Sequence, residues 1–210
     1  MNEIYLVRHA QSEHHVTQLT GGWTDTGITR LGRRQAELTG SRLASLIDDQ
    51  LTVSLISSDL KRAKETAGIL SGHMGLEMQL DSGLRELNNG SAAGLTREEA
   101  RRRENPITQP TLDWIAHTGA ESWRMMTDRL FGCMDRLATD SRTDISIIVS
   151  HGNAAIAIVQ WWLQLSESSR SGTSFEFDPC SISHLAINPF DERTIVRLND
   201  AGHLKEIQEA

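Results

Sequence analysis

The sequence has few of the features that mark disulfide-rich or membrane-spanning proteins. It contains two cysteines, Cys133 and Cys180, which lie far apart in the chain. Their separation excludes a disulfide framework and a CxxC redox or zinc motif. No apolar stretch approaches the roughly 20 residues that span a bilayer, and no basic leader precedes the first apolar run. We therefore expect a cytoplasmic protein in a reducing compartment, with no membrane partner.

An excess of basic residues is also missing. The formal net charge is -7 over 210 residues, and nucleic acids and anionic membranes both select basic surfaces, so we expect no nucleic-acid partner. An anionic small molecule would need locally concentrated arginine. Apolar residues make up 38% and charged residues 23% of the chain, a balance typical of globular proteins. The length suits one domain, which we place at 1-210.

The common motifs for nucleotides and metals are absent from the sequence. It has no GxxxxGK[ST] or GxGxxG loop, which cradle nucleotide phosphates. There are eight histidines, but His14 and His15 are adjacent and the others are scattered without HxxxH or HExxH spacing. We therefore expect neither a metal site nor a cofactor.

Apolar runs alternate with amphipathic segments along the chain. Strands are predicted at 4–7, 53–56, 145–149, 182–187 and 194–198. Helices are predicted after the caps Thr29, Asp59 and Ser122, and after the third strand through Leu165. This alternation predicts an α/β fold, a three-layer α/β/α sandwich around a mostly parallel central sheet.

Three distinctive segments follow predicted strands. They are Arg8-His9, residues 57–62, and Ser150-His151-Gly152. Because ligands of open α/β sheets bind beyond the carboxyl ends of the strands, we expect these segments to converge on one site.

The residue types in these segments suit phosphoryl transfer. Arg8 and Arg62 can clamp phosphoryl oxygens with bidentate donors. Two nearby guanidinium groups would lower the pKa of His9 and keep it neutral and nucleophilic. His151 could stabilise the transferring group as a cation, or donate a hydrogen bond as a neutral ring.

A departing alkoxide needs a proton from a positioned acid. Glu86, within the sequence Leu-Arg-Glu-Leu, is the candidate, with a solvated surface acid as the alternative. Thr96 and Glu99 form a capping-box pattern before an arginine-rich run, which indicates either a solvated helix or a basic rim that guides anionic substrates.

The motifs resemble those of the histidine phosphatase superfamily, also called phosphoglycerate mutase-like. Residues 6–13 (LVRHAQSE) resemble its signature, and residues 57–63, 84–86 and 149–152 resemble its later motifs in the same order. The resemblance extends from about Ile4 to Leu204. It implies a phosphoglycerate mutase-like fold and a phosphohistidine mechanism.

The resemblance also implies a role for each motif residue. His9 would be the nucleophile, Glu86 the proton donor, and Arg8, Arg62 and His151 the phosphate pocket.

By the same resemblance, further residues should lie near the substrate. These substrate-binding candidates are Gln11, Ser12, His15, Gly152 and Asn153. The sequence departs from the family pattern at Ala10, at His15 and at Ala92-Ala93, and the last two departures lie on the expected substrate side.

Three functions are compatible with these residues. The first is a phosphatase of small phosphorylated metabolites, the second a cofactor-dependent phosphoglycerate mutase, and the third a non-catalytic phospholigand-binding protein. The short segment between Glu86 and Gly119 favours an open pocket and hydrolysis. The apolar Trp161-Trp162 helix and the tail strands are candidates for a homodimer surface.

Overall fold

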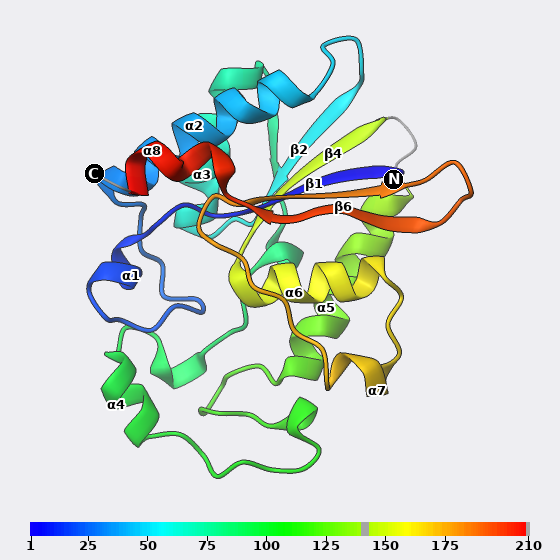
Figure 1. Cartoon of the computed structure of the whole chain (residues 1–210). Coiled ribbons are helices and arrows are strands. Elements are labelled where there is room, and N and C mark those ends of the chain that lie inside the picture. Colours follow the sequence, from blue (N-terminus) through cyan, green and yellow to red (C-terminus); the bar gives the residue numbers. More distant parts are fainter. Residues whose placement is uncertain (140–142, 209–210) are drawn as a thin grey trace.

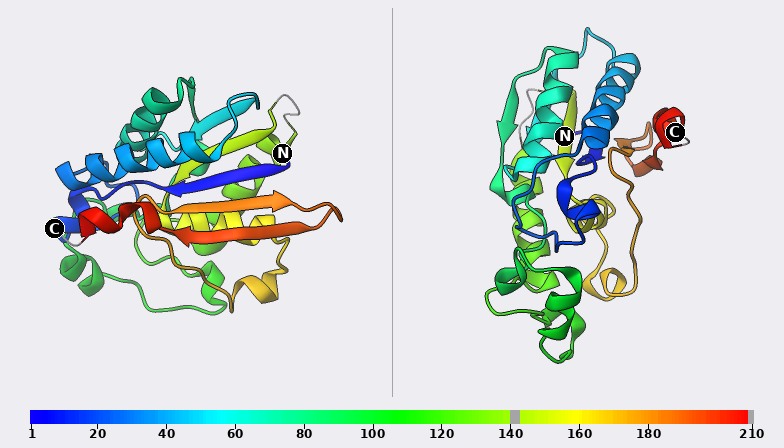
Figure 2. Two further views of the ribbon diagram at one scale, coloured as in Figure 1. Left: turned by 45° about the horizontal axis from the view of Figure 1, so that its top comes forward. Right: turned by 90° about the vertical axis from the view of Figure 1, so that its left-hand side faces the viewer.

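The protein folds around one six-stranded sheet (Figure 1). The computed structural model describes residues 1–139 and 143–208. The strands are β1 (Glu3–Arg8), β2 (Val53–Ser57), β3 (Met78–Leu80), β4 (Ile145–Ser150), β5 (Ile182–Ile187) and β6 (Arg193–Asp200). Their order is β3-β2-β4-β1-β5-β6. The first four are mutually parallel, whereas β5 and β6 form an antiparallel hairpin along one edge (Figure 2). The sheet is mostly parallel, as predicted.

Helices cover both faces of this sheet. The α-helices are α1 (Glu13–Val16), α2 (Arg30–Leu46), α3 (Lys61–Met74), α4 (Arg97–Arg102), α5 (Trp123–Ala138), α6 (Gly152–Trp162), α7 (Glu167–Arg170) and α8 (Lys205–Gln208). Short 3-10 turns are η1 (Ser82–Leu84), η2 (Gly90–Ala92), η3 (Thr111–Asp113) and η4 (Gly202–Leu204). In Figure 1, α2 and α3 lie above the sheet and α5 and α6 below it. This is the predicted three-layer sandwich.

The two layers follow from the alternation of side chains along each strand. In β1, Ile4 and Leu6 belong to the core between the sheet and helices α5 and α6, whereas Tyr5 and Val7 belong to the core between the sheet and helices α2 and α3. Successive side chains of a strand point to opposite faces, so a parallel strand buried on both faces has a continuous apolar run. The polar residues that follow these runs therefore stand at the edge of the sheet.

Most predicted helix starts are confirmed. The Thr29 side chain accepts a hydrogen bond from the Gly32 N–H, and Ser122 accepts one from the Met125 N–H. The predicted capping box at Thr96 is also present. These caps satisfy backbone donors that the first helical turn leaves unpaired.

The predicted cap at Asp59 is wrong. Helix α3 starts at Lys61, after Leu60, without a side-chain cap. Both Asp59 oxygens instead accept hydrogen bonds from Arg85, at 2.7 and 2.6 Å. The bidentate ion pair occupies the carboxylate, so it does not reach the helix start.

Other boundaries differ in smaller ways. Helix α6 ends at Trp162 rather than Leu165, and β3 was not predicted because Leu80 is exposed and no apolar run marks the strand.

Trp161 and Trp162 are buried in the core, so they cannot form the surface of a homodimer. The homodimer stays a prediction that rests on the tail strands. No helix within 1–139 or 143–208 has the length and apolarity to cross a membrane.

Candidate active site

The three segments that follow strands meet at the carboxyl edge of the sheet. In the parallel register, Arg8 at the end of β1 is the partner of Ser150 at the end of β4, and Ser57 at the end of β2 is the partner of Val149. The next residues in each chain segment therefore emerge side by side. The predicted convergence is confirmed.

His9 is the buried centre of this group, with 2% of its surface exposed. Its Nδ1 lies 2.7 Å from the Ala10 carbonyl oxygen. Because a carbonyl only accepts, Nδ1 must carry the proton. Arg62 Nε donates to His9 Nε2 at 3.0 Å, which assigns the lone pair to Nε2. The network thus fixes one tautomer, with the proton on Nδ1 and the lone pair on Nε2.

The electrostatic surroundings keep His9 neutral. Burial, followed by the positive charge of Arg62, the neighbouring His151 and the charge of Arg8, holds the pKa of His9 well below its ordinary value of 6.5. A low pKa leaves the imidazole unprotonated near neutral pH, where its lone pair can attack an electrophile.

Arg62, in the first turn of α3, is held rigidly beside His9. It is 1% exposed, and its Nη atoms donate to the carbonyl oxygens of Thr24 at 3.0 Å and Gly22 at 2.7 Å. The positive φ of Gly22, +55°, suits glycine. Burial lowers the pKa of Arg62 to about 10, so the guanidinium remains a cation at neutral pH.

Arg8 offers donors that the protein does not satisfy. One Nη donates to the Phe177 carbonyl oxygen, and the other lies 3.2 Å from His15 Nε2. His15 Nδ1 accepts a hydrogen bond from the Ser12 N–H at 3.1 Å, so the proton of a neutral His15 sits on Nε2. Two donors therefore face each other there. Arg8 Nε is buried and lacks a hydrogen-bond partner among the described residues. Unsatisfied donors of this kind suit an anion.

His151 has a ring nitrogen, Nδ1, that is buried without a hydrogen-bond partner among the described residues. Its Nε2 lies 2.7 Å from Ser58 Oγ, which accepts from the Leu60 N–H at 3.3 Å. If the Ser58 hydroxyl donates to Nε2, the ring proton sits on Nδ1, which lacks a partner among the described residues. Burial and the charges of Arg62 and Arg8 hold the pKa of His151 well below its ordinary value. Of the two expected states, the structure favours the neutral donor.

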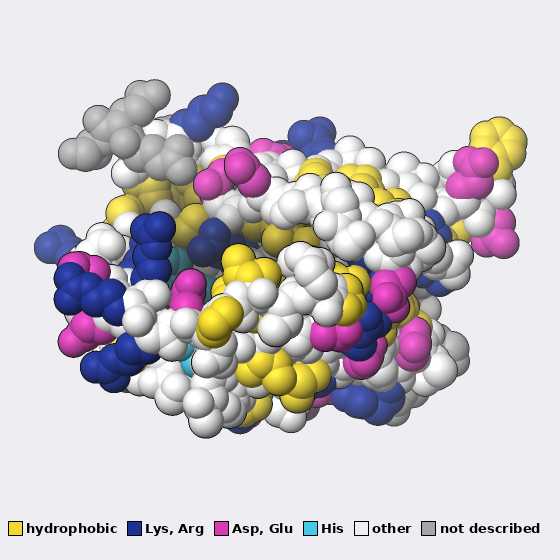
Figure 3. Space-filling view, turned by 90° about the horizontal axis from the view of Figure 1, so that it is seen from below, with side chains coloured by type: hydrophobic (Ala, Val, Ile, Leu, Met, Phe, Trp, Pro, Cys, Tyr) yellow, Lys and Arg dark blue, Asp and Glu magenta, His cyan; other side chains and the backbone are white. Residues whose placement is uncertain are grey.

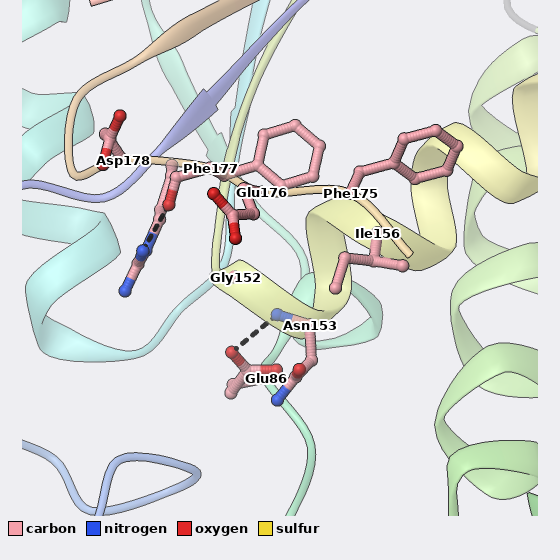
Figure 4. Close-up of a pocket in the computed structure, with 9 residues that line it drawn as sticks. Glu86, Gly152, Asn153, Ile156, Phe175, Glu176, Phe177 and Asp178 are labelled. Atoms are coloured by element: carbon pink, nitrogen blue, oxygen red, sulfur yellow. Dashed lines mark hydrogen bonds between the residues drawn. The ribbon is translucent and has the colours of Figure 1, made fainter. Parts of the chain in front are cut away.

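Glu86 is buried, with 9% of its surface exposed, and is not a surface acid. One carboxylate oxygen accepts from the Leu87 N–H at 2.8 Å and the other from the Asn153 N–H at 3.1 Å (Figure 4). The Trp23 indole donates to the Glu86 carbonyl oxygen at 2.7 Å. Backbone and side chain are thus fixed at the start of α6, beside Gly152.

The remaining candidates fall into two groups. Gln11 Oε1 accepts a hydrogen bond from the hydroxyl that caps α2, and Ser12 Oγ lies 2.8 Å from His14 Nδ1. These two side chains hold the loop after β1. Gly152 and Asn153 instead line an open cavity next to Glu86.

This cavity, of about 430 Å³, opens beside Arg8 and Glu86. It is lined by Arg8, Glu86, Gly152, Asn153, Ile156, Phe175, Glu176, Phe177 and Asp178. Figure 3 shows a hollow on this face, in which a histidine is visible between basic and acidic side chains. The sequence did not predict that residues 175–178, which we call the 175–178 segment, line the site. The signal that could have indicated it is the pair of aromatic residues inside a polar loop.

Three histidines approach one another in a way that the sequence did not predict. The ligand atoms of His9, His14 and His15 lie within 4.8 Å of one another, which is compatible with a metal site. However, burial and the charges of Arg8 and Arg62 lower the pKa of His14 to about 3 and of His15 to about 4. The same positive field repels a metal cation and attracts an anion.

The comparisons with known proteins agree with this geometry. The chain is 30% identical over 170 residues to a 2,3-bisphosphoglycerate-dependent phosphoglycerate mutase of Allorhizobium ampelinum, covering 74% of this chain and 77% of the relative. Its fold is similar to that of the alpha-ribazole phosphatase from Shigella flexneri, with a TM-score of 0.79, 22% identity and coverage of 94% and 96% of the two chains. A mycobacterial glucosyl-3-phosphoglycerate phosphatase gives a TM-score of 0.76 at 25% identity, with coverage of 95% and 99%.

The sequence matches the histidine phosphatase superfamily (branch 1) over residues 4–201, which include every candidate site residue. From the match and the arrangement of these residues, we conclude that the chain belongs to the histidine phosphatase superfamily.

Proposed function

We propose that this protein is a metal-independent phosphatase that hydrolyses small phosphomonoesters through a phosphohistidine on His9. The observation that carries the proposal is the His9 Nε2 lone pair, which is buried against Arg62 and lies in the same site as a buried carboxylate, Glu86. We further propose that residues 1-210 form one domain, because both hydrophobic cores share one sheet.

In the first step, the phosphoryl oxygens bind to the unsatisfied donors of Arg8 and His151 and to Arg62. Arg62 Nε then donates to a phosphoryl oxygen instead of to His9, which frees the Nε2 lone pair. Nε2 forms a bond to phosphorus as the phosphorus–oxygen bond to the alcohol breaks. Glu86 acts as the general acid and gives a proton to the departing oxygen. The Ala10 carbonyl, which accepts from Nδ1–H, stabilises the positive charge of the phosphorylated ring.

In the second step, water replaces the alcohol. Glu86, now a carboxylate, takes a proton from the water as its oxygen attacks phosphorus, and the nitrogen–phosphorus bond breaks. Inorganic phosphate and neutral His9 result. Arginines neutralise the phosphoryl charge in both steps, so the scheme requires no metal ion.

The names of similar proteins support a small phosphomonoester as substrate. Two structural neighbours are called alpha-ribazole phosphatase and glucosyl-3-phosphoglycerate phosphatase. The second candidate is a phosphoglycerate mutase, favoured by the 30% identity to such an enzyme. A mutase would use the same residues but return the phosphoryl group to a substrate hydroxyl. The full set of catalytic groups argues against a role in binding alone.

The decisive experiment measures a covalent intermediate. The protein is mixed rapidly with an aryl phosphate labelled in the phosphoryl group, denatured, and tested for label that is stable in base and labile in acid. We expect such label in the wild type, none in His9→Ala, and phosphate release that persists in EDTA. The matched control His73→Ala, on the surface of α3, should retain the label. Absence of labelled wild-type enzyme together with absence of phosphate release would refute the proposal, and conversion of 3-phosphoglycerate to its 2-isomer without release would establish the mutase.

A further inference from the structure

The proposed chemistry determines where the organic part of the substrate must lie. In a direct displacement at phosphorus, the leaving oxygen departs opposite the attacking nitrogen, within reach of the acid that protonates it. Glu86 is that acid in the proposed function, on which this inference rests. The cavity lined by Glu86, Asn153 and the 175–178 segment is therefore the site of the leaving alcohol.

The far wall of this cavity is joined to the phosphate site. The Phe177 carbonyl accepts a hydrogen bond from Arg8, which places the 175–178 segment over the clamp. Phe177 is buried, and Asp178 is held by Asn199, whose amide donates to Asp178 Oδ2 at 3.1 Å. The segment is thus anchored at both the phosphate site and β6.

The charges of the cavity are mostly negative. Among its lining residues within 1–139 and 143–208, Arg8 is the one cation, and the phosphoryl group requires it. Glu86, Glu176 and Asp178 contribute carboxylates. The Glu176 side chain is exposed and points from the segment toward the start of α6 in Figure 4. Among the described residues that line the cavity, none besides Arg8 carries a positive charge that could bind a carboxylate of the leaving group.

The apolar part of the wall defines the shape that the cavity accepts. Phe175, Phe177 and Ile156 contribute aromatic and aliphatic surface to the cavity that Glu176 also lines (Figure 4). Aromatic side chains stack on flat rings and attract cations to their faces. A ring with a positive group would therefore find both aromatic surface and the Glu176 carboxylate within one cavity.

We propose that the 175–178 segment selects phosphomonoesters of ring-containing alcohols that are uncharged or cationic, and rejects those that carry a carboxylate. Glu176 is the residue that sets the charge preference, by attracting a cationic group and repelling an anionic one. Phosphoglycerates, whose leaving alcohol carries a carboxylate, are poor substrates on this basis.

The test uses three aryl phosphates of one shape, with an aminomethyl, a hydroxymethyl or a carboxylate group opposite the ester oxygen. We expect kcat/KM to fall in that order for the wild type. In Glu176→Gln the ratio of the cationic to the anionic ester should fall by about tenfold, because one charge at contact distance is removed. Comparing ratios between variants cancels the intrinsic reactivities of the three esters. Glu176→Lys should reverse the preference.

The matched control is Glu77→Gln, the same change at an exposed residue of a different cavity, beside Met1 and Ser54. Its ratio should equal that of the wild type. Hydrolysis of all three esters with an unchanged ratio in Glu176→Gln would overturn the inference and leave the proposed function intact. Absence of phosphate release from all three esters would overturn both.

Discussion

Arg62 Nε donates a hydrogen bond of 3.0 Å to His9 Nε2. The lone pair that would attack phosphorus therefore accepts this hydrogen bond until a phosphoryl oxygen becomes the acceptor of the Arg62 Nε–H. The two Nη groups hold loop carbonyls at the same time. Arg62 thus fixes the tautomer of His9, and it can also bind a phosphoryl oxygen of the substrate.

Arg62→Lys should reduce kcat/KM by a factor of about 10² to 10³, the usual effect of losing one aligned donor to a transition state. Lysine retains the charge but lacks the planar fork that reaches His9 and both carbonyls. Steady-state kinetics with the hydroxymethyl aryl phosphate measure the effect. The control Arg33→Lys, at an exposed position of α2, should behave as wild type. Equal loss in both variants would contradict the role of Arg62.

The activity should persist at mildly acidic pH. The neutral form of His9 is the nucleophile, and its pKa is held well below 6.5. The fall of kcat/KM caused by protonation of His9 should therefore lie well below pH 6.5. In Arg62→Gln, one of the charges that lower the pKa is gone, so the same fall should move to higher pH. A pH profile of both proteins tests this prediction, and an acid limb at the same position in both would count against it.

Ser58→Ala should lower kcat/KM by about tenfold to a hundredfold, because His151 loses the partner that orients its ring. Ser58→Thr keeps the hydroxyl and should restore most of the activity. The control Ser57→Ala removes another buried hydroxyl, which donates to the Ser58 carbonyl oxygen. Both alanine variants should lose about 1 kcal/mol of unfolding free energy, so similar stability with different kcat/KM would separate positioning from folding. Equal activity of the two alanine variants would exclude this role for Ser58.

The free energy of unfolding should fall as the pH decreases below 6.5. The pKa values of His14 and His15 are about 3 and about 4 in the folded protein, against 6.5 ordinarily. Between these values the unfolded chain binds more protons than the folded one, so acid favours unfolding. One proton of difference corresponds to at most about 1.4 kcal/mol per pH unit, and the partial exposure of His15 reduces its share. Urea unfolding at about pH 7 and about pH 5 measures the slope. His14→Gln should reduce it, and a slope that this change leaves unaltered would contradict the linkage.

The sequence predicted that the three segments meet at one edge of the sheet, because they lie at the ends of strands. Once β1, β2 and β4 are parallel neighbours, their register brings Arg8, Ser57 and Ser150 together without further information. The position of Glu86 was predicted from the motif, not from periodicity. Local patterns and strand ends were sufficient for this part of the site.

The wall of the cavity could not be predicted in the same way. Phe177 meets Arg8 across a large separation in sequence, through a loop that has no strand or helix pattern. Asp59 shows that a capping pattern in the sequence can also fail, because its carboxylate binds Arg85, which is distant in the sequence, instead of the start of α3. The histidine cluster likewise arises because the loop after β1 folds back on His9.

Gly152→Ala should separate stability from activity. A Cβ at this position would lie 3.7 Å from Arg8 Nε and Cζ and 3.9 Å from Glu86 Oε2, which are ordinary contact distances. The fold therefore accepts the methyl group, and helix α6 gains up to about 1 kcal/mol from the better helix former. The methyl group nevertheless stands between the clamp and the acid, where the phosphoryl group must pass, so kcat/KM should fall by about tenfold or more. The control Gly68→Ala, in α3 with open space around its Cβ, should gain stability without losing activity. If Gly152→Ala remains fully active, the phosphoryl group does not lie between Arg8 and Glu86.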